Sequence, residues 1–456
     1  MAKIAFYGAV RGVTGSCYLV DTPAGKFLVD CGMFQGEHPE WNREPFGFTP
    51  SEIAAVLVTH PHADHTGRLP KLVKEGFEGM IYMPEACRPL SRLVLEDAAH
   101  LIAEEAKDAL EDPLFDMEDV ALAFERVQSV GYHHAIEILP GVTAMFHEAG
   151  HVLGSAFISI DMEGRHGGEP GRRIVFSGDI GNDNVPILPD TEVLHKADIV
   201  VCEATYGDRV HEGSDVRRAD LKACIEATVR EQGVLLIPAF SIERTQEVLY
   251  EINQILLNDL QTDVPIYLDS PMAIKATQTY RDFKAYLRFD DPVLSDPDRD
   301  FFSFPNLRET LSKDESKAIN FAPAPKIIIA GSGMMSGGRI MHHLLRYLSK
   351  PSTTLLVIGY QAKGTLGRTI QDGANEVRIF GERVNVKAKI KEIHSFSAHG
   401  DRDKLTRWLY PTEGGIPKKI ILVHGDAEQK IAFKEHLEKE LGTEVLIPAF
   451  GETIEV

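Results

Sequence analysis

The sequence predicts an α/β protein in which strand-rich segments at both ends flank a doubly wound parallel sheet. In the first segment, Gly, Pro and Asp separate short apolar runs, as is typical of a β-meander: KIAFYGA, SCYLVDTP, KFLVDCG and AAVLVTH. After Tyr206 the apolar runs become continuous, as in GVLLIPAF and KIIIAGSG, and amphipathic stretches such as RTQEVLYEINQILL separate them. That alternation indicates strands buried on both faces and joined by helices. From about Glu376 strand-and-helix pairs return and end in EVLIPAFGETIEV.

The composition indicates an ordinary globular protein. Of 456 residues, 43% are hydrophobic and 25% charged, and no apolar run reaches the ~18 residues that a membrane span needs. We expect no signal peptide, because MAKIAFYGAVRG lacks a basic stretch followed by an apolar one. The five cysteines are scattered, which favours reduced thiols in a cytoplasmic protein. The net charge of −20 opposes tight coating of duplex DNA, but bound cations can reverse the local charge of a site.

Metal-ligand residue types are densest directly after the apolar run AAVLV. Within THPHADH, four such side chains fall within six positions: His60, His62, Asp64 and His65. On a loop that leaves a strand, these groups can converge on one or two cations, and imidazole and carboxylate both suit Zn²⁺. The segment therefore predicts a metal site.

Further ligand-type residues follow other predicted strands. They are Asp30, His151, Asp179, Glu203 and His424. Strand ends are where a sheet scaffold gathers reactive groups, so their repeated position favours one shared site. Spacing alone does not decide between His147 and His151.

These motifs resemble the β-CASP branch of the metallo-β-lactamase superfamily. The HxHxDH run marks the superfamily, while SAHGD at 397–401 and VHGD at 423–426 are similar to motifs of the branch. The resemblance covers essentially the whole chain. It implies a metallo-β-lactamase αββα sandwich, formed by residues 1–207 and 376–456, with a doubly wound β-CASP domain inserted at 208–375.

The resemblance also implies a role for each motif residue. Two Zn²⁺ ions are expected, one bound by His60, His62 and His151 and the other by Asp64, His65 and His424. Asp179 would bridge both ions, and Asp30 would orient metal-site groups from behind the ligands. The similarity of GHVLGS to the third family motif selects His151 over His147. His399 in SAHGD would protonate the leaving oxygen, and Glu203 would support it.

A Gly-rich loop between a predicted strand and an amphipathic helix is a candidate phosphate site. Backbone amides at a helix start can hold an anion, although glycines also serve plain turns. The resemblance places a similar loop near the RNA backbone. The expected substrate-binding residues are Ser332, Gly333, Met334, Ser336, Gly337, Gly338 and Arg339. We interpret the histidines outside the motifs, His133 and His343 among them, as structural or surface residues.

The resemblance implies a zinc-dependent ribonuclease that hydrolyses phosphodiester bonds in single-stranded RNA. It would act as an endonuclease, with a 5′-exonuclease activity also open, and leave 5′-phosphate and 3′-hydroxyl ends. The alternatives are a small-molecule metallohydrolase, a DNA-directed nuclease and a catalytically inactive RNA-binding scaffold. An insert between Asp179 and His424 opposes the metallohydrolase, and His424, where DNA-specific relatives tend to have an aliphatic residue, favours RNA. The oligomeric state stays open, a homodimer included.

Overall fold

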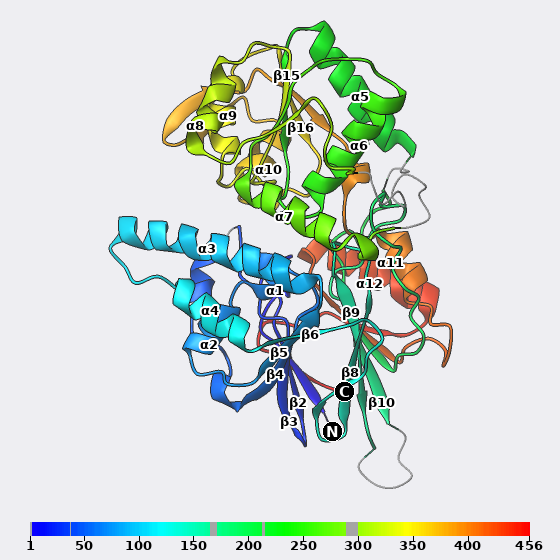
Figure 1. Ribbon diagram of the computed structural model, residues 1–456. Helices are drawn as coiled ribbons and strands as arrows, with labels where there is room; N and C mark the ends of the chain where they lie inside the picture. Colours follow the sequence, from blue (N-terminus) through cyan, green and yellow to red (C-terminus); the bar gives the residue numbers. More distant parts are fainter. Residues whose placement is uncertain (1, 37, 165–170, 212–214, 289–299) are drawn as a thin grey trace. The chain divides into compact units, whose positions relative to one another are not determined.

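The computed structural model describes residues 2–36, 38–164, 171–211, 215–288 and 300–456 (Figure 1). The chain forms two compact units. Unit 1 comprises Met1–Asp183, Pro189–Val210 and His399–Val456, and unit 2 comprises Asn184–Leu188 and His211–Ala398. The domain limits expected after residues 207 and 375 remain a prediction. In the described ranges, no helix combines the length and the apolar character that crossing a bilayer requires.

Unit 1 contains two seven-stranded sheets. The first has the order β22 (Thr453–Glu455), β1 (Lys3–Phe6), β2 (Tyr18–Thr22), β3 (Gly25–Val29), β4 (Ile53–Leu57), β5 (Met80–Pro84) and β6 (Val127–Val130). The second has the order β21 (Glu444–Leu446), β20 (Lys419–Val423), β11 (Ile199–Glu203), β10 (Arg172–Phe176), β9 (Ala156–Met162), β8 (Val142–Glu148) and β7 (Ile136–Leu139).

The two sheets pack face to face around a shared apolar core. Phe6 and Phe27 of the first sheet and Phe146 of the second belong to one buried cluster. Between the sheets, Tyr18 and Phe176 stack with ring centroids 6.0 Å apart. Such interdigitation of inward-facing side chains is how two sheets exclude water from a common interior.

Helices cover both outer faces of this sandwich (Figure 1). The helices on the first sheet are α2 (Leu69–Lys74), α3 (Cys87–Ala109) and α4 (Met117–Glu125). Those on the second sheet are α11 (Arg402–Trp408) and α12 (Ala427–Leu441). A short helix, α1 (Ala63–Thr66), follows β4. The expected αββα sandwich is therefore confirmed.

Unit 2 is built on a six-stranded sheet in which every pairing is parallel. Its order is β14 (Leu307–Glu309), β13 (Ile266–Leu268), β15 (Lys326–Ala330), β12 (Val234–Pro238), β16 (Thr353–Val357) and β19 (Lys389–Glu392). A separate hairpin pairs β17 (Glu376–Ile379) with β18 (Glu382–Asn385). The helices are α5 (Asp215–Arg230), α6 (Arg244–Asn258), α7 (Pro271–Asp282), α8 (Lys313–Ala318), α9 (Ile340–Tyr347) and α10 (Leu366–Gln371).

The strands of unit 2 are buried on both faces, as their continuous apolar sequences predict. Ile340 and Leu344 of α9 pack with Ile328 of β15 in one cluster, whereas α5 packs against β12, β15 and β16 outside that cluster. A parallel sheet needs helices on both faces because its crossover connections place them there. The predicted doubly wound insert is confirmed.

One detail differs from the sequence expectation. The run AAVLVTH does not extend a meander, because β4 pairs parallel to β3. Parallel neighbours need a long crossover connection, and residues 30–52 supply it. The last strand of the unit 2 sheet is β19, which pairs parallel with β16.

Candidate metal centre

The HxHxDH loop is anchored to two segments, one just before β2 and one just after β3. The amides of Ser16 and Cys31 donate to the carbonyls of Asp64 and His65 over 2.8 and 2.9 Å. Gly32 makes this close approach possible, because a Cβ atom there would lie 1.6 Å from the Asp64 carbonyl oxygen. His60 and His65 are buried as a result.

Asp179 occupies the centre of the site, just after β10. Its Oδ2 atom lies 3.4 Å from His60 Nε2 and 3.5 Å from His151 Nε2. Its Oδ1 atom lies 3.4 Å from His65 Nε2 and 3.6 Å from His424 Nδ1. The two oxygens of one carboxylate therefore face two different sets of imidazoles.

The first set contains His60, His62 and His151. Nδ1 of His62 lies 3.1 Å from Nε2 of His60 and 3.4 Å from Nε2 of His151. With Asp179, these residues offer ligand atoms within 4.8 Å of one another. His147 lies outside this group, so the structure brings His151 to Asp179 rather than His147.

The second set contains Asp64, His65 and His424. Oδ2 of Asp64 lies 3.3 Å from His424 Nε2 and 3.9 Å from His65 Nε2. His424 follows β20 with a φ of 46°, and its amide donates to Ala9. A left-handed backbone at a non-glycine residue costs energy and is typical of functional sites.

Asp30 lies behind the second set and is fully buried. Its Oδ1 accepts from the amide of Thr59 over 2.8 Å, and its Oδ2 accepts from the Thr59 hydroxyl over 2.9 Å. Oδ2 is also 2.7 Å from Nδ1 of His65. Because Asp30 holds a proton on Nδ1, it leaves Nε2 of His65 facing Asp179.

The pKa shifts in this cluster reflect crowding of buried acids and imidazoles. Burial lowers the pKa of His60, and repulsion from a protonated His65 lowers it further. Burial also opposes protonation of His65, but Asp179 and Asp30 outweigh it and raise its pKa to about 10. Burial raises the pKa of Asp179 despite the attraction of His424. Nearby positive charge stabilises the ionised form of these buried carboxylates. A bound metal ion supplies such a charge to several ligands at once.

His399 and Glu203 form a pair at the edge of the group. Nδ1 of His399 is 3.1 Å from Oε2 of Glu203 and 3.9 Å from Oδ2 of Asp179. Glu203 Oε1 also accepts from the Ile180 amide over 2.6 Å. Burial opposes ionisation of Glu203, but His399 outweighs it and lowers its pKa. Burial likewise opposes protonation of His399, but Glu203 and Asp179 raise its pKa.

Sequence reasoning missed the hydroxyl groups that bind the imidazole or the backbone of the predicted ligands. Oγ1 of Thr205 lies 3.0 Å from Nδ1 of His424 and donates to its carbonyl over 3.1 Å. The Ser155 hydroxyl accepts from the amide of His151 over 3.0 Å. Thr59 adjoins the HxHxDH motif and could have been noticed, but Thr205 and His424 lie 219 positions apart.

The donor set fits divalent transition-metal ions. Oδ1 of Asp179 is buried and accepts no hydrogen bond from any residue in the described ranges. Such an acceptor costs about 1–3 kcal/mol unless a partner satisfies it. Imidazole and carboxylate oxygen are ligands that zinc binds at about 2.0–2.2 Å.

The Gly-rich loop lies in unit 2, between β15 and α9. It closes on itself, because the Ser332 amide donates to the Gly337 carbonyl and the Ser336 amide donates to the Ser332 hydroxyl. The Arg339 guanidinium donates to Oδ1 of buried Asp269 over 2.7 Å and also to two backbone carbonyls. A substrate-binding role for this loop stays a prediction.

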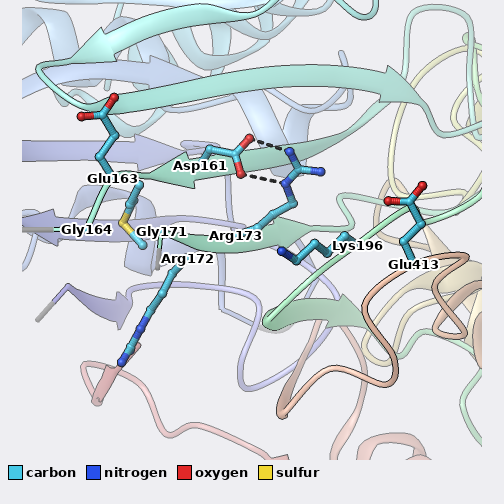
Figure 2. A pocket seen from close by; sticks show the side chains of 9 residues that line it. Asp161, Glu163, Gly164, Gly171, Arg172, Arg173, Lys196 and Glu413 are labelled. Carbon is cyan, nitrogen blue, oxygen red and sulfur yellow. Dashed lines mark hydrogen bonds and ion pairs between the residues drawn. The ribbon is translucent and has the colours of Figure 1, made fainter. Parts of the chain in front are cut away.

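A surface pocket of about 550 Å³ lies beside β9 and β10 of unit 1 (Figure 2). None of the expected site residues is among those that line it. Arg173 is held by Asp161 through two hydrogen bonds of 2.8 and 2.7 Å, so its charge is already neutralised. Figure 2 shows no convergence of the other charged side chains, so we assign this pocket no chemistry.

Three family descriptions match successive parts of the chain. They are "Metallo-beta-lactamase superfamily" over residues 10–153, "Beta-Casp domain" over 245–370 and "Zn-dependent metallo-hydrolase RNA specificity domain" over 383–448.

Similar proteins extend over the whole length. The chain is 38% identical to Ribonuclease TTHA0252 of Thermus thermophilus over 100% of both proteins. It is 30% identical to an RNase J-like protein of Methanocaldococcus jannaschii over 99% of each. Among solved structures, a protein of unknown function from Enterococcus faecalis matches with a TM-score of 0.53 and 11% identity, over 100% of both chains. That last likeness concerns the fold alone.

Proposed function

Because the chain belongs to the β-CASP family of metallo-β-lactamase-fold ribonucleases and is a metal-dependent ribonuclease, we propose that it cleaves single-stranded RNA with two zinc ions. The observation that carries this proposal is the position of Asp179, whose two oxygens face two separate imidazole sets. In two-metal hydrolases, a bridging carboxylate keeps both ions at the distance that one phosphate can span.

We assign three residues to each ion besides Asp179. One ion would be held by His60, His62 and His151, and the other by Asp64, His65 and His424. Asp30 would position His65 without touching either ion. When bound, zinc lowers the pKa of water towards neutrality and offsets negative charge on phosphoryl oxygens.

His399 is proposed as the general acid for the leaving oxygen. Nδ1 is directed at Glu203, so we assign the proton transfer to the opposite ring nitrogen, Nε2. His399 is also less buried than its partner, because 18% of its side chain is exposed, against 0% for Glu203. Glu203 would keep the ring oriented and favour its charged form. A general acid of this kind contributes about 10²–10⁴-fold to the rate.

The products would carry 5′-phosphate and 3′-hydroxyl ends, since the phosphate stays on the fragment beyond the cut. We propose internal cleavage as the main activity, with 5′-exonucleolytic trimming as a second mode on the same site. The five cysteines are buried free thiols, which supports a place in the reducing cytoplasm. A homodimer remains a prediction.

Labelled RNA tests the proposal. Single-stranded RNA with a 5′ or 3′ label is incubated with untreated, chelator-treated and zinc-restored protein, beside a DNA strand of matching sequence. We expect RNA cleavage that chelation abolishes and zinc restores, with 5′-phosphate ends on the products. Asp179→Ala should lose bound metal and cleavage together. Cleavage that survives chelation, or that occurs on DNA alone, would overturn the proposal.

A further inference from the structure

We propose that His133, His147 and Glu192 form an additional binding site for one divalent transition-metal ion in unit 1. His133 lies between β6 and β7, His147 lies on β8, and Glu192 lies between β10 and β11. Their ligand atoms lie within 4.8 Å of one another. The group shares no residue with the groups around Asp179, so it is a separate site.

The distances suit a tetrahedral ion. Oε2 of Glu192 lies 2.8 Å from Nε2 of His133 and 3.8 Å from Nδ1 of His147. Zinc with bonds of about 2.1 Å separates neighbouring tetrahedral ligands by about 3.4 Å, which falls between these two values. Small rotations of the His133 and Glu192 side chains, which are both partly exposed, would bring both distances to this value.

His147 and Glu192 are already oriented by other contacts. Nε2 of His147 lies 2.9 Å from the Ser159 hydroxyl, so Nδ1 is the nitrogen left to face Glu192. The His147 ring stacks on Phe157 with centroids 4.7 Å apart. Oε1 of Glu192 accepts from the Glu148 amide over 3.0 Å, and Oε1 and Oε2 lie 2.9 and 2.8 Å from Nε2 of His133. Metal-binding imidazoles and carboxylates characteristically have such supporting hydrogen bonds.

Solvent can reach this site. The side chains of His133 and Glu192 are 60% and 30% exposed, so an ion can enter and water can take the fourth position. Two imidazoles and a carboxylate favour zinc and similar transition metals over calcium or magnesium, which prefer oxygen ligands.

A bound ion would fasten the segment around Glu192 to β8. The Glu192 amide donates to the Glu148 carbonyl over 3.0 Å, and the Thr191 hydroxyl donates to the Ala149 carbonyl over 2.8 Å. Glu148 and Ala149 lie three and two positions before His151 in the sequence. We therefore expect the ion to raise the melting temperature of unit 1, because it binds the folded arrangement only.

The test measures bound zinc and thermal stability in parallel. Wild-type protein, His133→Ala and the matched control His134→Ala are equilibrated with zinc and freed of unbound metal, and zinc per chain is determined. His134 is a neighbouring exposed histidine outside the group. We expect His133→Ala to carry one zinc fewer than wild type and to lose part of the zinc-induced rise in melting temperature, and His134→Ala to match wild type. Glu192→Gln should repeat the loss.

The proposal is wrong if His133→Ala and Glu192→Gln both match wild type in zinc content and in the zinc-induced rise in melting temperature. The group would then be a plain His–Glu ion pair. The result is independent of the proposed ribonuclease centre. In an Asp179→Ala background, removal of His133 should still cost one zinc.

Discussion

Asp30→Asn removes the negative charge of Asp30 and keeps the shape of its side chain. Asparagine is nearly isosteric and tolerates the φ of 60° at this position, so the backbone should be preserved. The carboxylate accepts three hydrogen bonds of 2.7–2.9 Å while fully buried. An amide can accept at only one of its two ends, so at least one buried donor on Thr59 or His65 loses its acceptor.

The expected cost follows from these contacts. A hydrogen bond to a buried charged group contributes about 1.5–3 kcal/mol, and breaking a buried charged pair costs about 3–5 kcal/mol. We therefore expect Asp30→Asn to lower the free energy of unfolding by about 3 kcal/mol. Loss of a group that orients a metal ligand typically weakens metal binding about 10–100-fold. Without Asp30, His65 can carry its proton on Nε2, the nitrogen that faces Asp179.

Two measurements check this prediction. Denaturant unfolding of metal-free protein gives the stability change, and chelator competition gives the zinc affinity. Asp21→Asn is the matched control, because Asp21 is exposed on β2 and its replacement should change stability by about 0.5 kcal/mol or less. If Asp30→Asn retains both wild-type stability and wild-type zinc affinity, Asp30 does not hold His65 as we describe.

Three further substitutions test other parts of the structure. His399→Ala should keep its bound metal and lose RNA cleavage by about 10²-fold or more, and loss of metal instead would assign His399 to the ligands. Arg339→Ala should destabilise the protein by about 1.5–3 kcal/mol, because buried Asp269 loses its guanidinium donor but keeps the donors on Thr310, Ser316 and His343. The same variant tests the predicted substrate role of the loop: lower RNA affinity with a salt dependence flatter by about one charge would support that role, and unchanged binding by the folded variant would remove the loop from the substrate site. Gly32→Ala should disrupt metal binding, because the new Cβ would lie 1.6 Å from a backbone carbonyl of the HxHxDH loop; wild-type zinc content would refute this.

The sequence predicts a structural feature well where all of its residues are consecutive. The HxHxDH loop is one such case, because four ligand types follow one strand and need only a tight loop to converge. Continuous apolar runs likewise revealed the parallel sheet of unit 2. The αββα sandwich and the remaining site residues required the family resemblance, since strand-end residues can be recognised by type but their mutual distances cannot.

Features that depend on tertiary pairing were not accessible from the sequence. The parallel direction of β4 depends on how residues 30–52 cross, not on the strand's own residues. His133 lies outside the family motifs, and nothing in the sequence indicates that Glu192, 59 positions later, lies against its ring. Arg339 was expected to face phosphate, and nothing in the sequence indicated that Asp269, 70 positions earlier, lies against its guanidinium.

A zinc titration of metal-free His133→Ala protein tests the two-metal centre most directly. This variant lacks the additional site, so its bound zinc reports on the centre around Asp179 alone. We predict that RNA cleavage rises with bound zinc and levels off at two ions per chain. Full cleavage at one ion or fewer per chain, or zinc binding that brings no cleavage, would contradict the two-metal assignment.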